Sequence, residues 1–306
     1  MSNVKIAITG ATGFIGSYLI EGLKGKYELV GITRDASKCI SKSEVNYKLS
    51  DYSKESLMDA LLGCEAVVHL AAIRPLKGQE SDYLIYNKNV ELTSNIFESC
   101  RNVGISNIVF ASSRSVYNPR CNNIPFKTSD KIEYTLNLYG LSKYFCEKLA
   151  LYYNHYYGMD IKSLRLAQVL GVGEKEGVMV TEFIKRAMSK EPLIVYGEGK
   201  GKRHYVYVKD IVSAVEKALL NQSEEKIFNI AMENNISHRA FAELVNLVFD
   251  NINNIVFAKE LKEDTDEYLM DITHTKKYLN WFPSYDMYHA LLDMRKILEN
   301  EMGYDL

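Results

Sequence analysis

The stretch Thr9-Gly10-Ala11-Thr12-Gly13-Phe14-Ile15-Gly16 decides the fold of this chain. It follows an apolar, β-rich run at residues 4–9 and opens into residues 14–23, where apolar side chains recur at helical spacing. The first glycine allows a tight turn, the second lets the backbone approach a pyrophosphate, and the third lets the helix pack closely on the strand. Free N–H groups at the positive end of the helix attract the phosphates. We therefore expect a dinucleotide to contact Gly10, Thr12, Gly13, Phe14, Ile15 and Gly16.

Composition places the chain among ordinary globular proteins. Its 306 residues are 47% hydrophobic and 25% charged, enough for a sizeable core. A formal net charge of -2 gives no general attraction to nucleic acid or to an anionic membrane. The five cysteines are scattered without a C-x-x-C pair, and the six histidines form no metal-ligand pattern. With no leader visible and no apolar stretch long enough to span a bilayer, we expect a cytoplasmic protein without a metal.

Strand-like and helix-like segments alternate through the first half of the chain. Strands are expected at residues 28–33, 47–51, 65–72 and 107–112, and helices at 53–62, 81–103 and from 139 onward. Such alternation predicts an α/β fold, a doubly wound parallel sheet of Rossmann type with helices on both faces. Ligands of these sheets gather at the carboxyl ends of the strands, so the residues that follow each strand are the candidates for function.

The tip of the second strand carries two charges with opposite meanings. Arg34 favours NADP because it can pair with a 2′-phosphate, whereas Asp35 lies near the spacing at which an acid accepts the ribose 2′-hydroxyl of NAD. A solvated Arg-Asp turn is the plain alternative. The sequence therefore predicts NAD or NADP without choosing between them.

A candidate catalytic group follows the strand at 107–112. Tyr139 and Lys143 lie four residues apart at the start of a helix and project from one face. A tyrosine phenol has a reference pKa of about 10. We expect the neighbouring ammonium and a cationic nicotinamide to lower the pKa of Tyr139, so that it can exchange a proton with a substrate hydroxyl. Ser113, at the strand end, can hydrogen-bond the reacting oxygen.

These motifs together resemble the extended short-chain dehydrogenase/reductases, specifically their nucleotide-sugar epimerase/dehydratase group. Later segments extend the likeness over nearly the whole chain: Leu164 to Gly173, Tyr196 to Asp210, Phe228 to Ala231 followed by Ser237, and His274 to Pro283. Gln168 stands where the family usually has asparagine. The resemblance implies that Lys143 also holds the nicotinamide ribose. It further implies adenine contact by Asp51, cofactor contact by Leu70, Ala71 and Ala72, and substrate contact by Ser113, Arg114, Gln168 and Arg203. Arg203 is the first choice for a diphosphate, since a guanidinium grips phosphate bidentately.

The resemblance also implies a division into two interleaved parts and an oligomeric state. Residues 1–169 with 206–231 would form the NAD(P)-binding Rossmann domain, and residues 170–205 with 232–306 a smaller mixed α/β domain for the nucleotide sugar. The long helices near 81–103 and 139–157 suggest a homodimer. The tyrosine-rich run at 151–157 fits packing or dimer contacts better than base stacking, because its surroundings are not basic.

Among the activities of the family, a nucleotide-sugar 4-epimerase fits best. The 4,6-dehydratases usually carry an Asp-Glu pair after the catalytic serine or threonine, and here Arg114 and Ser115 occupy those positions. The main hypothesis is interconversion of UDP-glucose and UDP-galactose, or of their N-acetyl forms, by reversible hydride transfer at C4 through a 4-keto intermediate. The alternatives are an NAD(P)H-dependent 4-keto nucleotide-sugar reductase, which Arg34 favours, and a non-catalytic dinucleotide sensor. Neither the nucleotide base nor the sugar follows from the sequence.

Overall fold

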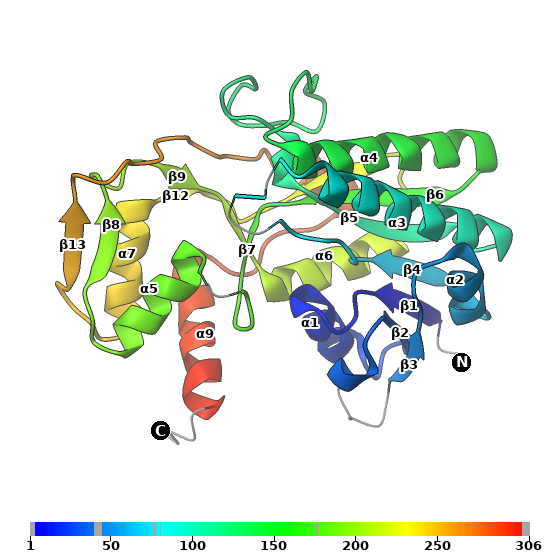
Figure 1. Cartoon of the computed structure of the whole chain (residues 1–306), viewed down its shortest axis with the longest axis horizontal. Coiled ribbons are helices and arrows are strands. Elements are labelled where there is room, and N and C mark those ends of the chain that lie inside the picture. Colours follow the sequence, from blue (N-terminus) through cyan, green and yellow to red (C-terminus); the bar gives the residue numbers. More distant parts are fainter. Residues whose placement is uncertain (1–3, 40–44, 76–77, 80, 176, 302–306) are drawn as a thin grey trace.

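A seven-stranded parallel sheet forms the centre of the computed structural model, which describes residues 4–39, 45–75, 78–79, 81–175 and 177–301 (Figure 1). Its strands are β1 (Lys5–Thr9), β2 (Glu28–Thr33), β3 (Asn46–Leu49), β4 (Ala66–His69), β5 (Asn107–Ser113), β6 (Asp160–Leu166) and β11 (Ile227–Ile230). Their order is β11-β6-β5-β4-β1-β2-β3, and every pairing is parallel. The chain reverses its direction of growth between β1 and β4, where doubly wound sheets bind ligands. The predicted fold class is confirmed.

Each face of the sheet buries its own hydrophobic core. Within β1, Ile6 and Ile8 belong to one core and Ala7 to the other, as the two-residue repeat of a strand requires. Helices α1 (Phe14–Leu23) and α6 (Val208–Leu220) cover the first core, while α2 (Lys54–Leu61), α3 (Tyr83–Asn102) and α4 (Leu138–Tyr157) cover the second. Burial on both faces explains the apolar runs in β1, β2, β4 and β5.

A smaller lobe packs beside the sheet, at the left of Figure 1. Its core joins α5 (Met179–Met188), α7 (His238–Val248) and α9 (Met287–Glu301) to β8 (Leu193–Tyr196) and β13 (Ile255–Ala258). Shorter elements link the lobe to the sheet: β7 (Gln168–Leu170), β9 (Lys202–Arg203), β10 (Tyr205–Tyr207), β12 (Ile236–Ser237) and α8 (Thr273–Leu279). Pairing is parallel in β8–β13 and β7–β10 but antiparallel in β9–β12, so the lobe is mixed.

We propose that the chain divides into two interleaved domains, residues 1–169 with 206–231 and residues 170–205 with 232–306. The separate core of the smaller lobe supports it. The boundary is not sharp, because Tyr205 and Tyr207 of β10 face the core of the lobe while Val206 faces a core of the sheet. None of the helices that the structure describes is both long and apolar enough to cross a bilayer.

Candidate active site

The glycine turn between β1 and α1 is built as the sequence predicts. Gly10 has a φ of +71°, and its carbonyl accepts a hydrogen bond of 2.9 Å from the Gly13 N–H. A Cβ on Gly16 would lie 2.2 Å from the Gly10 oxygen, so only glycine lets α1 begin this close to the turn. Gly13 caps α1 without a side-chain bond. The first N–H groups of α1 are thus free for an anion, which fits the pyrophosphate of a dinucleotide.

A cavity of about 260 Å³ at the ends of β2 and β3 is lined by two of the three residues expected near the adenosine. Arg34 and Asp51 both line it, and the Arg34 guanidinium lies 5.8 Å from the Tyr52 ring centre. The Asp35 carboxylate accepts hydrogen bonds from the backbone N–H and hydroxyl of Ser37, at 3.0 and 2.6 Å. Arg34 therefore faces this cavity, whereas Asp35 serves as a cap for a short 3-10 turn.

Tyr52 is a support of the glycine turn that the sequence did not reveal. Its hydroxyl donates to the Ile32 carbonyl at 3.2 Å and accepts from the Gly10 N–H at 3.3 Å. The residue is 7% exposed and adopts a φ of +68°, a strained conformation for a non-glycine residue. Nearby, the hydroxyl oxygens of Thr12 and Thr33 lie 3.1 Å apart, which ties the turn to β2.

A second cavity, of about 340 Å³, brings all three predicted catalytic residues together. Predicted residues that line it are Ile15, Leu70, Ala72, Ser113, Arg114, Tyr139, Lys143 and Gln168. Ala71 is not among its lining residues, since its N–H donates to the Thr9 hydroxyl at 3.2 Å and its backbone packs against Gly10. The cavity lies at the carboxyl ends of β4, β5 and β6, where a doubly wound sheet places its ligands.

A close contact between Gly140 and the turn after β5 aligns Tyr139 with Ser113. A Cβ on Gly140 would lie 1.9 Å from the Ser115 carbonyl oxygen, so the start of α4 touches the short turn Arg114–Val116. Asn137 caps α4 through a 2.9 Å bond from the Gly140 N–H. Ser113 Oγ accepts from the Ser115 N–H at 3.1 Å, and its own proton stays free to donate to a ligand.

Tyr139 and Lys143 share one face of α4, but the predicted charge effect is wrong for the protein without cofactor. Burial raises the pKa of Tyr139 to about 12, opposed mainly by the charge of Arg74. Burial lowers the pKa of Lys143 to about 8. The Lys143 ammonium lies 5.9 Å from the Tyr139 ring centre and donates to the Ala111 carbonyl at 2.9 Å. Desolvation thus dominates, and the main charge that opposes it is Arg74 and not Lys143.

A buried ion pair lies one helical turn beyond Lys143. Glu147 and Arg165 have side chains 0% and 2% exposed and are joined by hydrogen bonds of 2.7 to 3.2 Å. Glu147 also accepts from the Ser112 hydroxyl at 2.5 Å, and Arg165 donates to the Tyr117 hydroxyl at 2.8 Å. The pair therefore fixes α4 to β6 and to the end of β5, beside Ser113.

We predict that Glu147→Gln lowers the free energy of unfolding by about 3–5 kcal/mol, because it leaves the Arg165 charge buried without a counter-charge. Urea denaturation followed by circular dichroism measures the loss. Glu133→Gln is the matched control, since the Glu133–Lys131 pair is exposed and its removal costs at most about 1 kcal/mol. Equal losses in the two variants would refute the assignment of a buried, essential pair.

One ion pair at the catalytic cavity leaves no recognisable pattern in the sequence. Arg74, in the loop after β4, donates to Glu174, after β7, at 2.8 Å, and both line the cavity. Two charged residues a hundred positions apart form no sequence motif, so this pair is recognised only in the folded structure.

Arg203 does not present an open guanidinium. It donates to the carbonyls of Lys202 and Asp266, at 3.0 and 2.8 Å, and forms an ion pair with Asp264. Asp264 in turn lines a third cavity, of about 420 Å³, in the smaller lobe. This cavity adjoins the catalytic one, because Val178 lines the catalytic cavity while Gly177 and Met179 line the other. Its walls combine Phe183, Ile194 and Tyr196 with the cations Arg186 and Lys262.

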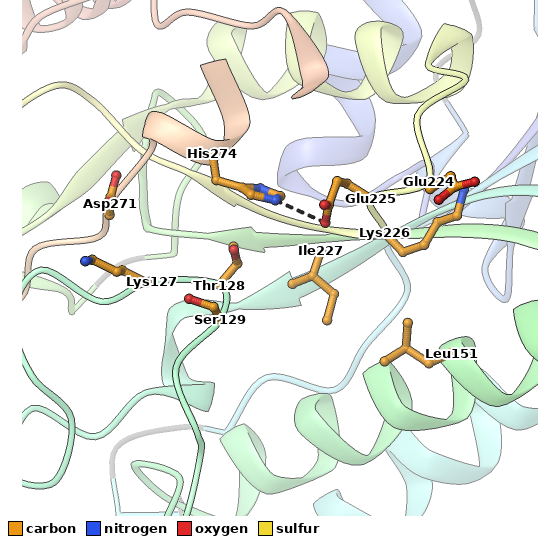
Figure 2. Close-up of a pocket in the computed structure, with 10 residues that line it drawn as sticks. All are labelled: Lys127, Thr128, Ser129, Leu151, Glu224, Glu225, Lys226, Ile227, Asp271 and His274. Atoms are coloured by element: carbon orange, nitrogen blue, oxygen red, sulfur yellow. Dashed lines mark ion pairs between the residues drawn. The ribbon is translucent and has the colours of Figure 1, made fainter. Parts of the chain in front are cut away.

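Another cavity, of about 490 Å³, lies at the start of β11 and is lined by both acidic and basic side chains (Figure 2). His274 pairs with Glu225 at 3.1 Å, and Lys226 pairs with Asp160 at 2.7 Å. It shares no described lining residue with the catalytic cavity. His69, which precedes the catalytic loop, is buried between Thr9 and Thr93 and is a packing residue.

A comparison with known protein families shows to which family the chain belongs. Residues 6–231 match the sequence model of the NAD dependent epimerase/dehydratase family. The chain belongs to this family. The resemblance recognised in its motifs is thereby confirmed, and so is its assignment as an enzyme. Among the described residues, no cluster of three or more histidine, cysteine or acidic side chains could hold a metal.

The proteins similar to this chain carry names that refer to several different activities or substrates. The chain is 32% identical over 230 residues to Protein CapI of Staphylococcus aureus, covering 70% of this chain and 69% of that protein. It is 27% identical over 302 residues to a UDP-glucuronate 4-epimerase of Thermodesulfobacterium geofontis, covering 93% of each. A solved UDP-N-acetylglucosamine 4-epimerase from Bacillus cereus is 30% identical, with a TM-score of 0.85 and coverage of 97% of this chain and 96% of that one.

Proposed function

We propose that the chain is a nucleotide-sugar 4-epimerase that works through a 4-keto intermediate. The observation that carries this proposal is the convergence of Ser113, Tyr139 and Lys143 on one cavity that Ile15, next to the glycine turn, also lines. The named similarities to UDP-glucuronate and UDP-N-acetylglucosamine 4-epimerases support it. The third cavity, with aromatic walls and two cations, is the proposed site of the nucleotide diphosphate.

The proposed mechanism assigns one task to each residue. A dinucleotide would be held by the α1 N-terminus, the Arg34–Asp51 cavity and Lys143, and its nicotinamide supplies the hydride acceptor and donor when bound. Tyr139 Oη takes the proton of the sugar C4 hydroxyl as C4 becomes a ketone, and returns it when the C4–H bond re-forms on the opposite face. Ser113 donates a hydrogen bond to the same oxygen, and the Lys143 ammonium stabilises the phenolate.

NAD is the proposed cofactor, in line with the description of the family. NADP stays the alternative because Arg34, not Asp35, lines the cavity at the ends of β2 and β3. The rival reductase would use the same three catalytic residues with added NADPH. A dehydratase is disfavoured, since Arg114 and Ser115 line the cavity where that reaction needs carboxylates.

Epimerase and reductase differ in the fate of the cofactor. The epimerase predicts purified protein that retains cofactor and interconverts UDP-glucose with UDP-galactose, or the N-acetyl or glucuronate pairs, without added reductant. Mass spectrometry of the released dinucleotide identifies NAD or NADP. Activity that requires added NADPH and a 4-keto sugar would refute the epimerase, and dinucleotide binding without turnover would support the sensor.

We expect activity to fall as the pH rises through about 8. Lys143 is protonated below its pKa of about 8 and neutral above it, so its stabilisation of the Tyr139 phenolate is lost on the alkaline side. The pH dependence of kcat/KM measures this, because that ratio reports groups of the free enzyme. Lys143→Arg keeps its charge and should lose the fall near pH 8 in whatever activity remains. An unchanged alkaline limb in this variant would contradict the assignment.

A homodimer is the proposed assembly. Helix α4 leaves Leu141, Phe145, Tyr152 and Tyr156 at least 40% exposed, an apolar face that a second copy could cover. Light scattering coupled to size-exclusion chromatography tests this proposal.

A further inference from the structure

Arg114 is a cation of the catalytic cavity that has no counter-charge. Its guanidinium carbon lies 4.3 Å from the Tyr268 ring centre, and its Nη1 is buried without a hydrogen-bond partner. Arg114 forms no ion pair with a carboxylate of the described residues, whereas the nearby Arg203 pairs with Asp264. A buried guanidinium without a partner is costly, so such a group in a ligand cavity calls for an explanation.

The other cations near this position are already neutralised or engaged. Arg203 lies 5.0 Å from the same Tyr268 ring but is paired with Asp264. Arg74 is paired with Glu174, and Lys143 donates to the Ala111 carbonyl. The described lining of the cavity thus holds three cations and one carboxylate, and that carboxylate pairs with Arg74 and not with Arg114. This excess of positive charge favours an anionic ligand group.

The place of Arg114 in the chain restricts which anion it can serve. It directly follows Ser113 and precedes Ser115, and all three line the cavity with Tyr139. An anion at Arg114 therefore belongs to the part of the substrate closest to the reacting carbon. The diphosphate has other candidate partners in the adjoining cavity of the smaller lobe, Lys262 and Arg186, although Arg186 also pairs with the exposed Glu191 at 3.4 Å.

We propose that Arg114 binds a carboxylate on the hexose, so that the preferred substrates are nucleotide-linked uronic acids. The proposal rests on the proposed 4-epimerase function and narrows its substrate. A guanidinium matches a carboxylate in two parallel hydrogen bonds, which a neutral hydroxymethyl group cannot form. Burial, and to a smaller extent Arg203, lowers the pKa of Arg114, but an arginine stays charged at neutral pH. The carboxylate would supply the counter-charge that the protein lacks.

The test compares UDP-glucuronate with UDP-glucose as substrates of the wild-type enzyme and of Arg114→Gln. We expect the wild type to favour UDP-glucuronate in kcat/KM by roughly 10- to 100-fold, the range for a hydrogen bond to a charged group. Arg114→Gln should remove this preference, because it lowers kcat/KM for UDP-glucuronate by a larger factor than kcat/KM for UDP-glucose. Arg120→Gln is the matched control, because Arg120 is 79% exposed on the same segment and should not alter the preference.

Two further measurements separate the possible failures. The affinity for UDP alone, by calorimetry, should be the same in the wild type and Arg114→Gln; a parallel loss for UDP and both sugars would mean that Arg114 serves the diphosphate, and would overturn the proposal. A wild type that prefers UDP-glucose overturns it even if the variant does not fold. If the wild type epimerises no nucleotide sugar at all, the proposed function fails, whereas turnover of neutral sugars alone refutes only the uronate assignment.

Discussion

Tyr139→Phe is expected to lower kcat by roughly 10²- to 10⁴-fold, the usual contribution of a positioned general acid–base. The substitution removes one oxygen and leaves the ring, so packing against Lys143 in the catalytic cavity is preserved. Steady-state epimerisation assays measure the loss. The amount of cofactor that copurifies should stay the same, because the glycine turn is untouched.

Tyr152→Phe provides the control for this prediction. Tyr152 lies on the same helix, is 48% exposed, and is not among the residues that line the catalytic cavity. It should retain wild-type turnover. If Tyr139→Phe also kept its turnover, the phenol would not carry the proton, and the sensor hypothesis would gain support.

Gly16→Ala is expected to weaken dinucleotide binding by roughly 100-fold. The added methyl group would lie 2.2 Å from the Gly10 oxygen and 2.8 Å from the Ala11 backbone. These are backbone atoms of the turn itself, so α1 must shift away from the phosphate site. Overpacking of this kind costs about 1–3 kcal/mol, and each 1.4 kcal/mol is tenfold in affinity.

Gly22→Ala separates this effect from a general loss of stability. Gly22 lies in the same helix, and its added methyl would meet the side chain of Val212 instead of the turn. We expect it to lower the melting temperature without changing dinucleotide affinity, measured by fluorescence titration of refolded, cofactor-free protein. A similar loss of affinity in both variants would show that helix stability, and not the turn, controls binding.

Local patterns were enough to predict the sheet and its glycine turn. The spacing of residues 9–16 gives a strand, a turn and a helix whose geometry depends only on neighbouring residues. Helix starts are equally local, since Ser53 and Ser237 cap α2 and α7 by accepting bonds from the N–H groups of Ser56 and Ala240. These features need no knowledge of distant segments, which is why the sequence reveals them.

Features made by distant segments could not be predicted. The Arg74–Glu174 and Glu147–Arg165 pairs each join residues whose types and spacings match no motif. The pKa of Tyr139 in the protein without cofactor could not be predicted for a related reason. The attraction of Lys143 is visible in the sequence, but the burial that opposes it depends on the packing of several loops. Arg203 likewise looked available because Asp264 lies 61 residues away.

The Arg74–Glu174 pair joins two loops that line the catalytic cavity. Arg74 belongs to the loop after β4 and Glu174 to the loop after β7, so moving these two loops apart would break the pair. The arginine is 46% exposed, and dissolved ions therefore weaken the attraction. Added salt should therefore loosen the link between these two loops, because a single pair of charges joins them across the lining of the cavity.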